Sequence, residues 1–192
     1  MIEDIQCRHC GAPGHDICSD CADFHAKKKS ICPPLYLKTD PKRLSLKAQS
    51  LIDYEYSPKG LAIWGRSGTG KTRVAWLIVN RWIADGKKVA CFDALSFSHG
   101  VDLQFGNGDG PEWISAICKH DAVFFDDIDK CKFTERVASE LFCLVERFAA
   151  DEKPLIITSN TSGDAFERRF PEHIGGALRR RLREFCRVEG FE

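Results

Sequence analysis

Residues 65–72 read Gly-Arg-Ser-Gly-Thr-Gly-Lys-Thr and match the phosphate-loop pattern G-x-x-x-x-G-K-[ST] at every fixed position. Glycines let the backbone N–H groups of such a loop turn toward phosphate oxygens, and the following helix adds the positive end of its dipole. We expect Lys71 to reach the β- and γ-phosphates and the Thr72 hydroxyl to ligate Mg²⁺. The residues predicted to hold the nucleotide are Gly65, Ser67, Gly68, Thr69, Gly70, Lys71 and Thr72.

Two adjacent acids, Asp126 and Asp127, directly follow the apolar run 122–125. A phosphate loop needs a carboxylate beyond a neighbouring strand to hold Mg²⁺ through water, and a second group to orient the attacking water. We expect Asp126 to lie on the metal side and Asp127 to orient or activate the water, with a shorter reach than the glutamate more usual there. Asp129 is expected to lie outside the site. The alternative is that these acids only cap a helix in solvent, which their position after a buried strand disfavours.

A third polar position follows the apolar run 155–158, where Ser159 and Asn160 end the run. Asn160 is placed to hydrogen-bond the γ-phosphate or the attacking water. The alternative is that Ser159 and Asn160 begin an ordinary turn. The pattern is weak alone and gains specificity from the phosphate loop and the acid pair that precede it.

Four arginines lie within five positions, Arg179, Arg180, Arg181 and Arg183. Their guanidinium groups repel one another unless anions or water receive them. One hypothesis is an arginine finger that acts in trans on ATP held by a neighbouring subunit, which can contribute roughly 10³–10⁵ in rate. Arg181 is the first choice for this finger and Arg180 the second. The alternative is a solvated basic face or a nucleic-acid contact.

Two C-x2-C pairs near the N-terminus predict a zinc module, because two such turns can bring four thiolates to one tetrahedral Zn²⁺. Its ligands would be Cys7, Cys10, Cys18 and Cys21. Substitutes for one ligand would be His9, His15, His25 and Cys32. The alternative is a set of unrelated reduced cysteines. Three lysines at 27–29 could contact a phosphate backbone or form a solvated linker.

The other five cysteines are scattered among apolar neighbours and are expected to be buried, reduced core thiols. They are Cys91, Cys118, Cys131, Cys143 and Cys186.

The composition sets limits on the class of protein. The chain has 192 residues, 43% of them hydrophobic, so it can form one medium domain plus a small appendage. Its formal net charge is zero, which excludes a uniformly basic nucleic-acid coat. No apolar run approaches the roughly 20 residues that span a bilayer, and the N-terminus lacks a signal-peptide pattern. These features predict a cytoplasmic protein without a membrane segment.

The elements that must position these residues alternate along the chain. Short apolar runs predict strands at 61–64, 89–92, 122–125, 155–158 and 185–188. Apolar spacing predicts helices at 71–84, 112–119 and 134–149, the last with Thr134 as N-cap, and a short helix near 44–54. Such alternation predicts an α/β fold, a parallel sheet covered on both faces. We divide the chain into a zinc-binding module (1–32), a linker with a short helix (33–57) and the ATPase core (58–192).

The ordered motifs resemble those of the IstB/DnaC-like AAA+ ATPases. The resemblance covers most of residues 32–190. It rests on the phosphate loop, Phe125-Asp126-Asp127, the segment 132–137 with its following helix, Thr158-Ser159-Asn160 and the segment 180–186. The segments 32–36 and 39–41 are similar to the entry segment of ATP-binding proteins in this group.

The resemblance implies a five-stranded parallel sheet of order 5-1-4-3-2, ATP-dependent assembly and single-stranded DNA binding. Carried over by position, Lys71 and Thr72 correspond to Walker A, Asp126 and Asp127 to Walker B, Asn160 to sensor 1 and Arg181 to the finger. Asp127 departs from the usual glutamate, which predicts slow, partner- or DNA-stimulated hydrolysis. The chain is also expected to lack the helical lid with its second sensor arginine.

Family members load replicative helicases or assist transposases in choosing targets. We therefore expect a nucleotide-controlled DNA replication helicase loader that uses ATP, Mg²⁺ and Zn²⁺ and forms ATP-dependent homo-oligomers on single-stranded DNA. The alternatives are an IstB-type transposition target-selection ATPase, a small viral-type helicase motor, and a non-enzymatic zinc-bearing adaptor with structural nucleotide. The partner would be a replicative helicase in the first case and a transposase in the second.

Overall fold

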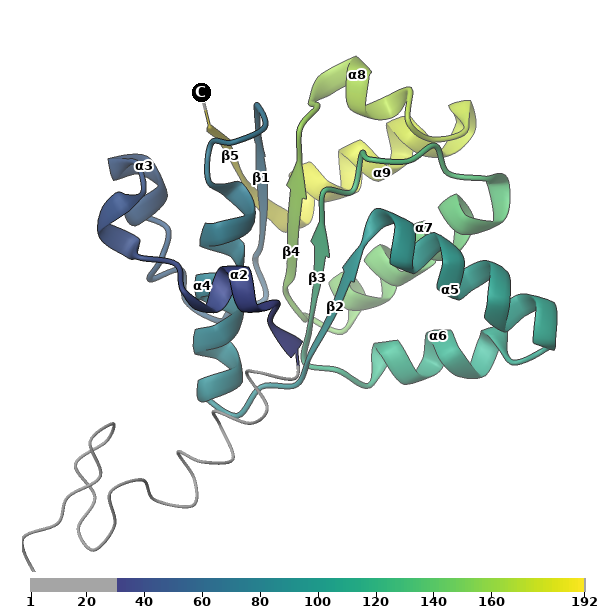
Figure 1. Cartoon of the computed structure of the whole chain (residues 1–192). Coiled ribbons are helices and arrows are strands. Elements are labelled where there is room, and N and C mark those ends of the chain that lie inside the picture. The colour runs from purple at the N-terminus through teal and green to yellow at the C-terminus, as the bar shows by residue number, and fades with distance from the viewer. Residues whose placement is uncertain (1–30, 192) are drawn as a thin grey trace, which may run out of the picture.

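A computed structural model of the chain describes residues 31–191 (Figure 1). The cysteines proposed as zinc ligands, and the lysines at 27–29, lie outside the described residues. Cys32 is described and is buried against the first long helix, where Asn80 Nδ2 lies 3.5 Å from its sulfur. Among residues 31–191, no helix is both long enough and apolar enough to cross a membrane.

Five parallel strands form one sheet in the order β2-β3-β4-β1-β5, as the resemblance implied. The strands are β1 (Gly60–Gly65), β2 (Val89–Asp93), β3 (Ala122–Asp126), β4 (Leu155–Ser159) and β5 (Cys186–Phe191). In register, Leu61 of β1 pairs with Ile156 of β4, and Val123 of β3 pairs with Leu155. The carboxyl ends of β1, β3 and β4 therefore meet at one edge of the sheet, where the polar residues of the motifs follow them.

Helices cover both faces of the sheet (Figure 1). The described helices are α2 (Pro34–Leu37), η1 (Pro41–Arg43), α3 (Leu46–Gln49), α4 (Lys71–Ala84), α5 (Ala94–Asn107), α6 (Gly110–Cys118), α7 (Glu135–Ala150), α8 (Gly163–Glu167) and α9 (Glu172–Phe185). Connections between parallel strands are right-handed, so the direction in which the chain crosses the sheet decides which face a helix covers. The chain crosses one way from β1 to β2, which puts α4 on one face. It crosses the opposite way from β2 through β3 and β4 to β5, which puts the later helices on the other face.

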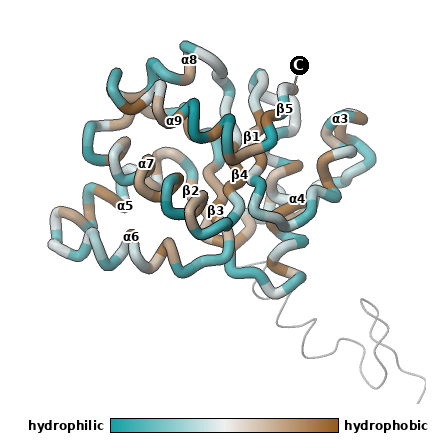
Figure 2. The backbone as a smooth tube through the Cα atoms, turned by 180° about the vertical axis from the view of Figure 1, so that it is seen from behind, coloured by the Kyte–Doolittle hydropathy of each residue, from teal (hydrophilic) through white to brown (hydrophobic). Residues whose placement is uncertain are grey.

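Two buried clusters, one on each face, hold the layers together. Alternate residues of β1 point to opposite faces, so Leu61 and Ile63 pack with α4 whereas Ala62 joins the cluster under α7 and α9. The same alternation separates Phe124 from Phe125 in β3. Figure 2 shows apolar residues along the central strands and polar residues on the outer turns. Most of the predicted strands were expected to be apolar on both faces, and this is confirmed for β1, β3 and β4, whereas β5 is largely exposed between its ends.

The segment before β1, predicted as a linker with a short helix, packs on α4. Tyr36 of α2 stacks on Trp76 of α4 with ring centroids 6.1 Å apart. The helix predicted near 44–54 is shorter than expected and covers only Leu46–Gln49, where Ser45 caps it by accepting from Ala48 N–H at 3.2 Å. The following residues, 50–53, form turns that bury Leu51 against α4.

Helix α5 was not predicted from the sequence. A capping box between Asp93 and Ser96 starts this helix, and Gly108 in the left-handed region (φ 89°) ends it. Gly100 has a packing role, since a Cβ there would lie 2.8 Å from the ring of Trp113. Helix α9 also runs through Phe185, so β5 begins later than predicted.

The expectation of buried core thiols holds for only part of the set. Cys118 and Cys186 are buried, Cys91 and Cys131 are half-buried, and Cys143 is exposed, so the prediction for Cys143 is wrong. It lies on the outer face of α7, where the helical period turns it away from the core. Burial raises the pKa of the Cys186 thiol to about 12, which makes it a poor nucleophile.

Candidate nucleotide-binding site

The predicted phosphate loop joins β1 to α4 at the carboxyl edge of the sheet. Gly70 takes a left-handed conformation (φ 91°) as the N-cap of α4, so the helix begins at Lys71 with its N–H groups open to the loop. Gly65 lies so close to β5 that a Cβ would be 2.0 Å from the Phe191 carbonyl oxygen. Both glycines are therefore required by the backbone path, and the helix N-terminus is oriented to receive an anion.

Lys71 is only 4% exposed and its ammonium makes three hydrogen bonds. It donates to the carbonyl oxygens of Gly65 and Arg66, both at 2.8 Å, and to Oδ1 of Asn160 at 3.0 Å. Burial lowers the pKa of Lys71, and the three acids Asp127, Asp129 and Asp126 oppose that lowering. The side chain is folded over its own loop, so a phosphate would have to replace some of these partners.

Thr72 and Asp126 are brought together as expected for a magnesium site. The Thr72 hydroxyl donates to Oδ1 of Asp126 at 2.8 Å, and Thr158 donates to the same oxygen at 2.6 Å. Burial raises the pKa of Asp126, while the hydrogen bonds from Thr158 and Thr72 oppose the rise. A hydroxyl and a carboxylate oxygen this close suit a hard cation such as Mg²⁺. No cluster of three or more His, Cys, Asp or Glu that could hold a metal occurs among residues 31–191.

Asp127 and Asn160 also meet at this edge of the sheet. Asn160 Nδ2 donates to Oδ1 of Asp127 at 3.1 Å. Asp127 has a left-handed backbone (φ 48°), and its N–H donates to the Thr158 hydroxyl at 2.8 Å. A non-glycine residue with positive φ is uncommon, and such conformations gather at functional sites. The sequence alone gave no sign of this conformation.

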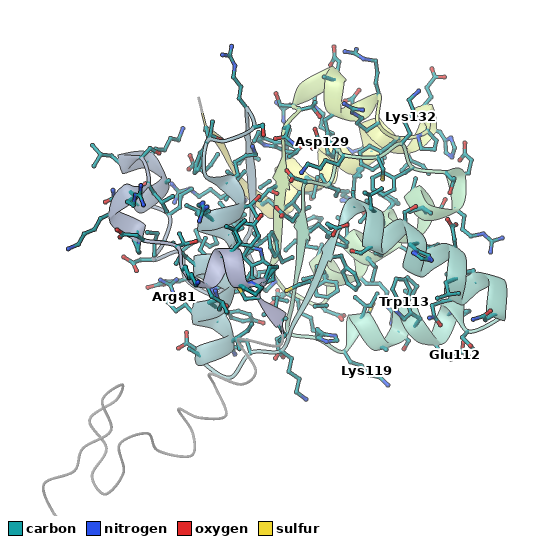
Figure 3. All side chains as sticks on the ribbon, in the orientation of Figure 1. Arg81, Glu112, Trp113, Lys119, Asp129 and Lys132 are labelled. Carbon is teal, nitrogen blue, oxygen red and sulfur yellow. The ribbon has the colours of Figure 1, made fainter. Side chains whose placement is uncertain are left out.

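Asp129 was expected to lie outside the site; it does not line the cavity described below, but it contacts the backbone of Asn160. Its side chain is buried above the ends of β3 and β4 (Figure 3), and Oδ1 accepts the backbone N–H of Asn160 at 2.9 Å. The chain after β3 turns back toward β4, since Ile128 N–H donates to the Thr158 carbonyl oxygen at 3.0 Å. That turn carries Asp129 behind Asn160, where it fixes the asparagine.

Sequence reasoning missed two further residues beside Asp129. Thr158 links Asp126 to Asp127, and Lys130 forms an ion pair with Asp127 at 2.5 Å. A hydroxyl at the end of an otherwise apolar strand was an available signal for Thr158. Nothing in the spacing singled out Lys130, because the turn that aims it at the acid pair is a tertiary feature.

A cavity of about 780 Å³ is lined by Lys71, Thr72, Asp127, Lys130 and Asn160. One wall carries the phosphate loop with Lys71, Asp127 and Asn160, and the opposite wall comes from the segment before β1. That second wall mixes apolar and basic side chains, including Leu35, Tyr36, Arg43, Leu44 and Lys47. A cavity with a phosphate cradle at one end and apolar side chains at the other has the chemistry that a nucleotide requires.

The arginines of α9 do not reach this cavity within the chain. Arg181 is paired with Glu146 of α7 and, at 2.9 Å, with Glu184. Arg179 is paired with Asp164 at 3.1 Å and with Glu167 at 2.7 Å. Arg180 and Arg183 are exposed. A finger on α9 would therefore have to act on a neighbouring subunit.

The sheet order, the loop and the acid pair after β3 define a P-loop protein with the α/β fold of the AAA+ class. The family model described as the bacterial DnaA ATPase domain matches residues 44–182, more than half of the chain. The chain belongs to this family. A search of curated proteins gave no match.

Several solved structures share the fold. AMPPCP-bound DnaA from Aquifex aeolicus is 20% identical, with a TM-score of 0.62, and the match covers 76% of this chain and 44% of that one. A DnaI structure is 14% identical, with a TM-score of 0.70, covering 86% of this chain and 100% of the other. A DnaC helicase loader is 14% identical, with a TM-score of 0.60, covering 93% of each chain. The chain thus spans less than half of the Aquifex protein but nearly all of these two smaller ones.

Proposed function

We propose that this protein binds and hydrolyses ATP with Mg²⁺ at the cavity between the phosphate loop and the segment before β1. The observation that carries the proposal is the joining of Lys71, Asp127 and Asn160 in one hydrogen-bonded chain beside the loop. In this proposal Lys71 and the N-terminus of α4 bind the phosphates, and Thr72 and Asp126 hold Mg²⁺. Asp127 and Asn160 orient the attacking water.

The proposed mechanism separates binding from hydrolysis. Lys71 neutralises phosphate charge, and Mg²⁺ supplies further electrostatic stabilisation of the transferring phosphoryl group when it is bound. Asp127 accepts a hydrogen bond from water, and Asn160 holds that carboxylate in place. Aspartate is one methylene shorter than the usual glutamate, so we propose slow hydrolysis that a partner or DNA stimulates.

We further propose that the protein acts in DNA replication as a nucleotide-controlled helicase loader that binds single-stranded DNA. Membership of the DnaA ATPase family supports a replication role. The likeness of the fold to the DnaI structure and to the DnaC helicase loader supports the loader role. ATP would promote homo-oligomers whose α9 arginines complete neighbouring sites. A transposase as partner, as in IstB-type proteins, is the competing outcome of the test below.

Nucleotide titration of the full chain with Lys71→Ala as the variant tests the binding site. We expect the variant to lose ATP affinity by about a hundredfold or more, since several charge-assisted contacts are lost. Unchanged affinity would overturn the site. Lys119→Ala is a suitable control, because its exposed side chain follows α6 and does not line the cavity.

Affinity capture with ATP, with ADP and without nucleotide tests the proposed role. Recovery of a hexameric helicase only with ATP supports the loader. Recovery of a transposase would replace the loader with the target-selection function. Recovery of neither partner, together with no binding to single-stranded DNA, would leave only the ATPase.

A zinc module at residues 1–32 is proposed on the sequence alone. Elemental analysis of the full chain is expected to find about one zinc per chain, and Cys7→Ser with Cys10→Ser should remove it. A metal-free protein would exclude the module. The ATPase proposal does not depend on the outcome.

A further inference from the structure

A second lysine, Lys130, faces the candidate nucleotide cavity. It lies in the turn after β3, and its side chain is 61% exposed and helps to line the cavity with Lys71 and Asn160. Neither the phosphate-loop pattern nor the acid pair includes a residue at this position. Its place in the site therefore comes from the turn, which brings the ammonium to 2.5 Å from Oδ2 of Asp127.

The partner of Lys130 is held on both of its oxygens. Oδ1 of Asp127 accepts from Asn160, and Oδ2 accepts from Lys130. The backbone of Asp127 is also fixed, because its N–H donates to the buried Thr158 hydroxyl. Lys130 is the most exposed of these groups and is carried on a flexible four-carbon stem, so it can move while Asp127 stays in place.

Lys71 and Lys130 are two cations that line the same cavity and repel each other. Lys71 is buried, whereas Lys130 is largely exposed. The hydrogen bond to Asp127 raises the pKa of Lys130, which keeps this lysine charged. An anion placed between the two ammonium groups would relieve their repulsion. Lys130 pairs with one oxygen of Asp127, and the negative charge of Asp126 adds to the attraction. Because the lysine is 61% exposed, this ion pair contributes little stability.

We propose that Lys130 contacts the terminal phosphate of ATP and so distinguishes ATP from ADP. In the empty site Lys130 pairs with Asp127. When ATP is bound, Lys130 donates to an oxygen of the γ-phosphate and leaves Oδ2 of Asp127 open to the attacking water. The exchange replaces one hydrogen-bonded ion pair with another, and no covalent bond is made or broken. The inference rests on the proposed ATP site and adds a residue to it.

The proposed exchange requires that Lys130 can reach the γ-phosphate, and the position of Asp127 supports this. A carboxylate that orients the attacking water must lie about one water molecule from the γ-phosphate. A lysine already in contact with that carboxylate therefore needs only a rotation of its stem to reach the phosphate. With ADP there is no γ-phosphate, and Lys130 keeps its pairing with Asp127.

Equilibrium titration of the full chain with Mg·ATP and Mg·ADP tests the inference. The variants are Lys130→Met, which keeps length without charge, and Lys130→Arg, which keeps the charge. Lys132→Met is the matched control, because Lys132 is exposed two residues further on and does not line the cavity. Thermal melts verify that each variant is folded.

We expect Lys130→Met to weaken ATP binding by about tenfold or more, the loss of one charge-assisted hydrogen bond, and ADP binding by less than about threefold. Lys130→Arg should retain most of the ATP preference, and Lys132→Met should match the unaltered protein. An unchanged ratio of the two affinities in Lys130→Met, or tighter ATP binding, would overturn this inference alone. Failure of the unaltered protein to bind either nucleotide would overturn the proposed function and the inference with it.

Discussion

The ammonium of Lys71 lies 3.0 Å from the amide oxygen of Asn160, a residue 89 positions away in the sequence. β1 and β4 are neighbours in the sheet, so the loop after one strand faces the turn after the other. Asn160 passes the contact on to Asp127 through its amide nitrogen. One asparagine therefore connects the residue proposed to bind phosphate with the residue proposed to orient water.

Substitution of Asn160 should separate hydrolysis from binding. In Asn160→Ala we expect kcat to fall by roughly 10²–10³, because the orientation of Asp127 is lost, with ATP affinity little changed. Asn160→Asp should instead weaken ATP binding by about tenfold or more, because a carboxylate would compete with phosphate for Lys71. Single-turnover kinetics and nucleotide titration measure the two effects. If the two variants changed kcat and ATP affinity to the same extent, the role given to Asn160 would be contradicted.

The Thr158 hydroxyl is expected to be a structural requirement of the acid pair. Thr158→Val keeps the shape but leaves Asp126 without its closest donor and Asp127 N–H without an acceptor. Unpaired buried groups of this kind cost about 1–3 kcal/mol. At this chain length each kcal/mol lowers Tm by about 2–4 °C, which calorimetry can measure.

Thr158→Ser is the control for that variant, since it keeps the hydroxyl and removes only a methyl group. It should retain more ATPase activity than Thr158→Val. A Thr158→Val protein that is as stable and as active as the unaltered one would show that the hydroxyl is dispensable.

Asp126 should limit stability when the site is empty. Its pKa is raised by burial, so the unfolded chain holds the proton less tightly than the folded protein does. Stability from this group is thus lost as pH rises from its ordinary pKa of 3.8 through the raised folded pKa, and the full cost applies above the folded pKa. Asp126→Asn should therefore melt higher at pH 7 without nucleotide, by about 2–4 °C for each kcal/mol gained.

The advantage of Asp126→Asn should shrink as pH falls toward 3.8, where both proteins carry a neutral side chain. Melting curves across that pH range give the comparison. The same variant should lose Mg²⁺-dependent hydrolysis. If the Tm of Asp126→Asn exceeded that of the unaltered protein by the same amount at every pH, burial of the Asp126 charge would not be the cause of the difference.

Arg181 is expected to act between subunits. Arg181→Ala should lower ATPase activity by roughly 10³–10⁵-fold while leaving ATP binding intact, since a finger contacts only the transferring phosphate. Mixing this variant with Lys71→Ala should restore partial activity, because some interfaces then pair an intact finger with an intact loop. Arg180→Ala in the same mixtures tests the second choice.

The mixing experiment also tests the ion pairs that hold Arg181. Glu146 and Glu184 compete with any phosphate for its guanidinium group. Glu146→Gln should therefore raise, and not lower, the activity of assembled protein. If no mixing ratio of the two inactive variants recovers activity, the trans finger is wrong.

The sequence by itself determined the parallel sheet, its strands, the phosphate loop and the two acids after β3. These features are local: a glycine pattern, a run of apolar residues and a polar residue at its end specify them within a few positions. The helix α4 and the Thr134 cap of α7 were predictable for the same reason, since both depend on short-range spacing.

Only the tertiary structure decided which side chains surround Asp127. The turn after β3 carries Asp129 to the backbone of Asn160 and carries Lys130 to Asp127. The second wall of the cavity, including Tyr36 and Leu44, likewise depends on how the segment before β1 packs against α4. Spacing along the chain cannot give these relationships, because each joins strands or turns whose proximity is fixed by the order of strands in the sheet and by burial.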